Sequence, residues 1–226
     1  MITVALIPAY NEETRIADAI HDARRFVDLV VVVDDCSKDQ TAERARSAGA
    51  IVLRHVINRG QGAALQTATE YALTVLKADI VVHFDADGQM DGSEIPSLID
   101  PIVREEADVV LGSRFLGKQT NMPMTRLVAN RLGRLFTSVF SGIHLTDTHN
   151  GFRALSRHAA QEITITLNRM AHASQILDLI KVKKLRYIER PVTIRYSQET
   201  LAKSPSSLRA FGIVKDILKD KFLTHV

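Results

Sequence analysis

Apolar runs alternate with amphipathic segments through the first half of the chain. Five short runs rich in β-branched residues are predicted to be strands, at 2–7, 29–34, 50–55, 79–84 and 108–113. Several lack polar alternation, as strands covered on both faces of a parallel sheet do. Between them, helical spacing of apolar residues covers about 12–26, 39–48, 60–76 and 93–106. The pattern predicts an α/β fold with a doubly wound, mostly parallel sheet flanked by helices.

The second half is less regular. Helices are predicted at about 125–140 and 171–181, and two short strands separated at Pro191 are predicted within 185–196. A polar loop at 197–207 precedes a last amphipathic helix. No stretch has the composition of a linker, so we expect one domain, 1–226, in which residues from about 116 onward are built onto the edge of residues 1 to about 115.

Composition excludes some classes of function. Hydrophobic residues make up 46% of the chain and charged residues 24%, with a net charge of +3 spread along the sequence. A nucleic-acid partner is therefore not expected, because such proteins concentrate basic residues on one face. Cys36 is the single cysteine, which fits a reducing compartment. No apolar stretch approaches the roughly 18 residues of a membrane span. We expect a cytoplasmic protein, and the last helix leaves contact with the inner face of a membrane open.

Acidic residues follow two of the predicted strands directly. Ligands of open parallel sheets bind beyond the carboxyl ends of the strands. Asp85 and Asp87 follow the strand at 79–84, and carboxylates this close repel unless a cation lies between them. Oxygen ligands favour Mg²⁺, Ca²⁺ or Mn²⁺, and Gln89 adds a neutral oxygen. The alternative interpretation is a simple turn rich in Asp and Gly.

Two further segments suggest a nucleotide. Asp34 and Asp35 end a buried strand, where either carboxylate would accept hydrogen bonds from a nucleobase or ribose. The segment "NRGQGAAL" (58–65) opens a helix with two glycines, which permits close approach of a phosphate to the backbone. A glycine-rich helix start without a ligand is the equally favoured alternative.

The order of these segments resembles a known family. "IPAYNEE", "VVDDCSKDQT", "NRGQGAAL", "FDADGQ", "GSRF" and "DTHNGFRALSR" occur as in GT-A-type glycosyltransferases of family 2, in the dolichyl-phosphate mannose synthase-like branch. The resemblance is dense over 1–157. It implies a UDP- or GDP-linked sugar donor, one Mg²⁺ or Mn²⁺ ion and inversion at the anomeric carbon. It also implies a nucleotide site, formed by Pro8, Tyr10, Glu12, Asp34, Asp35, Asp85 and Ala86. It implies a metal site as well, formed by Asp85, Asp87 and Gln89.

The resemblance places the acceptor in the second half. Asp147 is the candidate catalytic residue, as a general base or as a carboxylate that orients the sugar. If the acceptor is a phosphate, Arg114, Arg131 and Arg153 are candidates to clamp it, although each would also suit a surface ion pair. The resemblance implies a polyprenyl phosphate or a glycan as the acceptor. The chain has no tryptophan, so the Q-x-x-R-W motif of processive synthases is absent, and we expect one sugar to be added per encounter.

The predicted function is therefore a metal-dependent inverting glycosyltransferase. Two alternatives are a nucleotidyltransferase-like enzyme and a nucleotide-binding relative without activity. A nucleotidyltransferase should carry a glycine-rich basic loop after the first strand, where "IPAYNEE" stands instead. Whether the chain forms a homo-oligomer stays open.

Overall fold

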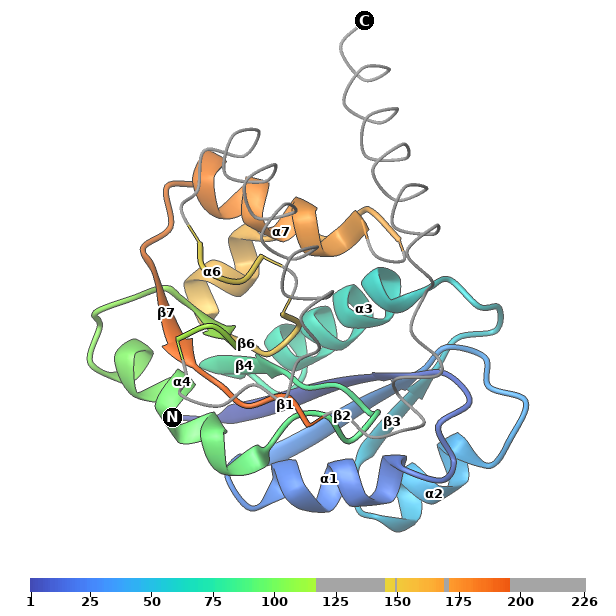
Figure 1. Cartoon of the computed structure of the whole chain (residues 1–226). Coiled ribbons are helices and arrows are strands. Elements are labelled where there is room, and N and C mark those ends of the chain that lie inside the picture. The colour runs from blue at the N-terminus through green and yellow to red at the C-terminus, as the bar shows by residue number, and fades with distance from the viewer. Residues whose placement is uncertain (117–144, 149, 169–170, 196–226) are drawn as a thin grey trace, which may run out of the picture. The chain divides into compact units, whose positions relative to one another are not determined.

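The computed structural model describes residues 1–116, 145–148, 150–168 and 171–195 (Figure 1). They belong to one compact unit, Met1–Arg195, and a second unit, Tyr196–Val226, lies outside the described residues. The helices predicted at 125–140 and after 207, the loop at 197–207 and the candidate Arg131 also lie outside them. The organisation of the chain as one domain stays a prediction.

Seven strands of the described residues form one sheet in the order β3-β2-β1-β4-β6-β5-β7. Neighbouring strands run parallel except at β6, which is antiparallel to both β4 and β5. The predicted doubly wound, mostly parallel α/β sheet is therefore confirmed. The strands are β1 (Thr3–Ala9), β2 (Leu29–Asp34), β3 (Ile51–Arg54), β4 (Ile80–His83), β5 (Val109–Ser113), β6 (Arg153–Ser156) and β7 (Tyr187–Pro191).

Helices cover both faces of the sheet (Figure 1). Along β1, Ala5 and Ile7 face one hydrophobic core, while Val4 and Leu6 face the other. This alternation explains why the strand is apolar at every position. The first core is covered by α1 (Ile16–Arg24), α2 (Thr41–Ser47) and α4 (Ile95–Val103). The 3₁₀ turn η1 (Gly92–Glu94) precedes α4. The second core is covered by α3 (Gln61–Thr74), α6 (Arg157–Glu162) and α7 (Ala171–Val182).

Strand β6 was not predicted from the sequence. Its four residues, Arg153–Ser156, include no β-branched or aromatic side chain, so they carry no local strand signal. The strand forms because β4 and β5 supply pairing partners on both sides and because Ala154 and Leu155 each enter one of the two cores. Tertiary pairing decides the conformation here.

The prediction of two strands around Pro191 was wrong. The single strand β7 ends at Pro191, and no strand follows in the described residues up to Arg195. Two backbone N–H groups after Pro191 donate hydrogen bonds to residues outside the sheet. Thr193 N donates to the Glu94 carboxylate at 2.9 Å, and Arg195 N donates to the Gln89 carbonyl oxygen at 2.8 Å. These bonds attach the segment to η1 and to the loop that follows β4.

No helix in the described part of the chain is long and apolar enough to cross a lipid bilayer. The cytoplasmic location expected from the sequence stays a prediction.

Candidate active site

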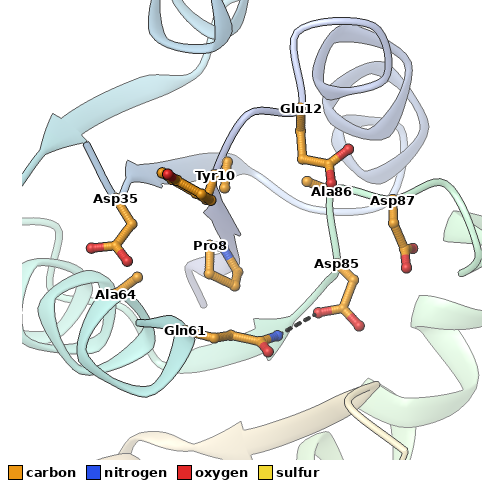
Figure 2. A pocket seen from close by; sticks show the side chains of 10 residues that line it. Pro8, Tyr10, Glu12, Asp35, Gln61, Ala64, Asp85, Ala86 and Asp87 are labelled. Carbon is orange, nitrogen blue, oxygen red and sulfur yellow. Dashed lines mark hydrogen bonds between the residues drawn. The ribbon is translucent and has the colours of Figure 1, made fainter. Parts of the chain in front are cut away.

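A cavity of about 280 Å³ lies where β1 and β4 end and α3 begins (Figure 2). Most of the residues that line it were expected from the sequence: Pro8, Tyr10, Glu12, Asp35, Asp85, Ala86 and Asp87. Ala9, Gln61 and Ala64 complete the lining and were not predicted. The parallel strands thus bring together residues from four segments that are far apart in the sequence, as their shared rim requires.

The turn after β1 is fixed by bonds to the turn after β2. Asn11 adopts a left-handed conformation with φ of 54°, which asparagine tolerates better than most residues. Its N–H donates to Ser37 Oγ at 2.9 Å, and its Oδ1 accepts from Lys38 N at 2.9 Å. Tyr10, beside it, keeps 44% of its surface exposed at the cavity. A flat ring therefore stands at the cavity's edge, on a turn that other residues hold.

The two carboxylates at the end of β2 have different surroundings. Asp35 lines the cavity, and its oxygens accept from His55 Nδ1 at 2.7 Å, Arg59 N at 2.8 Å and Gly60 N at 2.6 Å. It therefore organises the loop that leads into α3. Asp34 is fully buried and does not line the cavity.

Asp34 has structural partners instead. Its Oδ1 accepts from Ser37 N at 3.0 Å, and its Oδ2 lies 3.1 Å from Arg54 Nε in an ion pair. The structure thus brings Asp35 to the cavity and turns Asp34 away from it, a distinction that the sequence pair "DD" does not carry.

Asp85 and Asp87 lie together on the side of the cavity opposite Asp35 (Figure 2). Burial and, to a smaller extent, the neighbouring charge of Asp87 raise the pKa of Asp85 to about 7, against the opposing charge of Arg153. Burial likewise raises the pKa of Asp87, although the Gln89 N–H, which donates to Asp87 Oδ1 at 3.0 Å, opposes that shift. The fold therefore holds two carboxylates where their ionisation is unfavourable without a cation.

These residues suit a divalent cation. Carboxylate oxygens are the ligands that Mg²⁺ and Mn²⁺ prefer. The part of the chain that the structure describes shows no group of three or more His, Cys, Asp or Glu side chains placed to hold a metal. A two-carboxylate site still fits Mg²⁺, which usually takes one or two carboxylates and completes its shell with water and substrate phosphates.

The third predicted metal ligand, Gln89, does not line the cavity. Its backbone is engaged on both sides, at Asp87 and at Arg195. Its predicted role as a side-chain ligand stays a prediction, and the contacts present give it a part in shaping the turn.

On the other side of β4 the charged residues pair with one another. Asp147, which is buried, accepts from Arg114 Nε at 2.6 Å through Oδ2 and from Arg114 Nη2 at 2.7 Å through Oδ1. The Glu189 carboxylate accepts from the backbone N–H groups of Thr146 and Asp147 at 2.9–3.1 Å. Two residues that the sequence analysis gave separate roles, Asp147 and Arg114, thus form one bidentate ion pair.

Arg153 is a buried cation between the two regions. Its side chain is 2% exposed, and Nε donates to the Asn150 carbonyl oxygen at 3.0 Å. Burial lowers its pKa to about 10, while the charges of Asp85 and Asp147 act in the opposite direction. The nearby His83 is buried too, and burial together with the charges of Arg153 and His172 lowers its pKa to about 3. Arg153 therefore stays charged at neutral pH, and His83 stays neutral.

Comparison with known proteins identifies the family. The sequence model of Glycosyl transferase family 2 matches residues 4–164. The chain belongs to glycosyltransferase family 2. It is 31% identical to the UDP-N-acetylglucosamine–dolichyl-phosphate N-acetylglucosaminyltransferase of Methanococcus voltae, over 94% of this chain and 93% of that one. It is 29% identical to the undecaprenyl-phosphate mannosyltransferase of Micrococcus luteus, over 85% of this chain and 83% of that one.

Solved structures support the same fold for this family 2 glycosyltransferase. Glucosyl-3-phosphoglycerate synthase of Mycobacterium tuberculosis, crystallised with Mn²⁺, UDP and glucosyl-3-phosphoglycerate, superposes with a TM-score of 0.69. The match covers 93% of this chain and 75% of that one, at 21% identity. The predicted family, enzyme class and GT-A-type fold are therefore confirmed.

Gln61 is the polar residue of the cavity that the sequence reasoning missed. Its Nε2 donates to Asp85 Oδ1 at 3.1 Å (Figure 2). The segment "NRGQGAAL" was recognised for its glycines, and a glutamine between them in the first turn of a helix was the available signal. The pairing with Asp85 is visible only once α3 lies beside the end of β4.

Proposed function

We propose that this glycosyltransferase moves one sugar from a nucleotide sugar to a polyprenyl phosphate, with inversion and with a divalent cation at Asp85 and Asp87. The observation that carries the proposal is the pair of carboxylates that line the cavity of a family 2 fold, where the charges of Arg153 and Arg15 oppose the raised pKa values only in part. The Mn²⁺ and UDP bound to the synthase of the same fold support it.

The chemistry of the leaving group explains the need for these acids. When the bond between the anomeric carbon and the diphosphate breaks, negative charge grows on the diphosphate. A divalent cation supplies electrostatic stabilisation of that charge without transfer of a proton. Asp85 and Asp87 would hold the cation, so neither carboxylate needs to touch the sugar.

The remaining lining of the cavity suits the nucleoside. We assign Pro8, Tyr10 and Glu12 to its contact surface, together with Ala86 between the two acids in the sequence. Asp35 already accepts three hydrogen bonds from the loop after β3, so its main effect would be to hold that loop against the nucleoside. A UDP-linked donor is supported by the M. voltae relative and the synthase, whose names include UDP.

The region of Arg114 and Asp147 suits a phosphate acceptor better than it suits a sugar hydroxyl. A sugar hydroxyl requires a base, and both oxygens of Asp147, the candidate base, are bound to Arg114. A phosphate monoester with a second pKa near 6 is already anionic at neutral pH. We therefore assign Asp147 to orienting Arg114, and Arg114 with the predicted Arg131 to the acceptor phosphate. Arg153, which is buried, would act on that phosphate only through its charge. Such an acceptor would place the reaction at the membrane surface.

The test is transfer by the full chain. Radiolabelled UDP- and GDP-sugars are supplied with Mn²⁺ or Mg²⁺ and with polyprenyl phosphate or a saccharide. We expect labelled polyprenyl-phosphate sugar of inverted anomeric configuration from one donor, and none when a chelator is present. The Asp85→Asn, Asp87→Asn double variant should lose the transfer activity. Asp100→Asn, on the exposed face of α4, should keep that activity. Nucleotide binding without transfer to any acceptor would instead favour a non-catalytic relative.

A further inference from the structure

Gln61 occupies a distinct place in the cavity. It is the first residue of α3, a helix of 14 residues, and its side chain enters the cavity toward Asp85 (Figure 2). The residue before it, Gly60, has φ of 89°, a backbone conformation that a residue with a side chain rarely adopts. Asp35 fixes that glycine by accepting its N–H at 2.6 Å. The direction of Gln61 is therefore set by a rigid backbone.

Asp85 is restrained from three sides. Its N–H donates to Met90 Sδ at 3.2 Å, which fixes the backbone at the start of the turn. Its Oδ1 accepts from Gln61 Nε2 at 3.1 Å. Its Oδ2 faces Gly151, where an added Cβ would lie only 3.0 Å away. Gln61 is the one of these three that directly holds a carboxylate oxygen by a hydrogen bond from a side chain.

The chemical nature of Gln61 matters as much as its position. An amide donor orients a carboxylate but carries no charge, so Asp85 keeps its full attraction for a cation. Arginine and lysine at such a position would form an ion pair, as Arg114 does with Asp147. Groups that hydrogen-bond to metal ligands fix the direction of those ligands, and their loss typically costs about 10–100-fold in metal affinity.

We propose that Gln61 is a positioning residue, whose side-chain amide holds the Asp85 carboxylate in the orientation that binds the divalent cation. The inference rests on the proposed function, since it requires a cation at Asp85 and Asp87. Gly151 acts with Gln61 by leaving space for the second oxygen of the same carboxylate.

The experiment measures binding of Mn²⁺ alone to the full chain, by the electron paramagnetic resonance signal of the free ion. Gln61→Leu removes the donor with little change in size, and we expect a rise of about tenfold in the Kd for Mn²⁺. Gly151→Ala crowds the other oxygen and should raise the Kd in the same direction. Gln40→Leu is the matched control, because Gln40 is exposed beside α2 and its side chain does not line the cavity.

Two further readouts separate positioning from a general structural role. The Tm and the Kd for UDP in the presence of a chelator should stay at the values of the unaltered protein in Gln61→Leu. In steady-state assays the apparent KM for Mn²⁺ should rise, while kcat at saturating Mn²⁺ recovers to within about threefold.

An unchanged Kd for Mn²⁺ in Gln61→Leu would overturn the inference. So would a weaker UDP affinity in chelator by the same factor as for Mn²⁺, together with a lowered Tm, because these would show a general structural role. Asp85→Asn is measured in parallel. If that variant also binds Mn²⁺ normally, the proposed function fails; if only Gln61→Leu does, the positioning role alone fails.

Discussion

The acidic residues on the two sides of β4 have different partners. At the cavity between β1, β4 and α3, Asp85 and Asp87 lie next to each other, and the side-chain donor to Asp85 in the described contacts is the uncharged Gln61. On the other side, Asp147 is matched by the guanidinium of Arg114, and Glu189 is matched by backbone N–H groups. The negative charges of the first region are opposed only in part, by the charges of Arg153 and Arg15, whereas the second region pairs its acids directly.

This difference is what the proposed function predicts for a cation site at Asp85 and Asp87. A pair of carboxylates with raised pKa values opposes folding, and a bound cation would offset that cost. A buried ion pair with bidentate geometry instead fixes the direction of its members. The four variants below should respond in different ways if the contrast is correct.

The largest effect is expected for the double change Asp85→Asn, Asp87→Asn. Loss of the electrostatic stabilisation of the leaving group should lower kcat by about a thousandfold. The Kd for Mn²⁺ should rise beyond the measurable range, while the protein stays folded. Steady-state transfer assays and circular dichroism check both points. Transfer within tenfold of the unaltered rate would contradict the assignment of the acids to the cation.

Asp147→Asn should act mainly on stability. Removing one member of a buried ion pair leaves its partner uncompensated, at a cost of about 3 kcal/mol in the free energy of unfolding. Urea denaturation at neutral pH measures the loss. Asp108→Asn, which weakens the exposed ion pair with Arg186, is the control and should cost well below half as much. Equal losses in the two variants would show that the Arg114–Asp147 pair is no more than a surface contact.

Metal-free stability should depend on pH through Asp85. The unfolded carboxyl ionises near its model value of 3.8, and the folded one near 7, so the unfolded state loses its proton first. Stability in chelator should therefore fall as pH rises from about 4 to about 7. Asp85→Asn should flatten this slope and stabilise the metal-free protein at pH 8 by about 1 kcal/mol, less than the full shift implies because the side chain is half-buried. If the substitution leaves the dependence of stability on pH unchanged, Asp85 is not the group that causes this dependence.

The smallest effect is expected at the contact that joins the segment after β7 to the loop after β4. Arg195 Nη2 pairs with Asp91 Oδ2, and the arginine side chain is 62% exposed. Arg195→Ala should cost at most about 1 kcal/mol in unfolding free energy, because exposed ion pairs contribute little. The Kd for Mn²⁺ should change less than threefold, since the backbone bond from Arg195 N to Gln89 remains. A tenfold change would make the side chain a partner in the metal site.

The sequence was most informative where a local signal exists. The strands at β1, β2, β4 and β5 were predicted because each is a dense apolar run, and most cavity residues were predicted because they follow those runs. Strand β6 was missed, since its conformation depends on partners far away in the sequence. The same limit applies within the site: the separation of Asp34 from Asp35, the pairing of Asp147 with Arg114 and the contact from Gln61 to Asp85 all depend on directions of side chains that only packing sets.

The antiparallel direction of β6 has a consequence for how this enzyme can diversify. Because β5 ends and β6 begins at the same rim, Ser113 and Arg153 both lie there, beside the end of β4. Insertions or exchanges between these two anchor points leave the order of the strands unchanged. The sequence can therefore vary there while the acids that follow β4 keep their places.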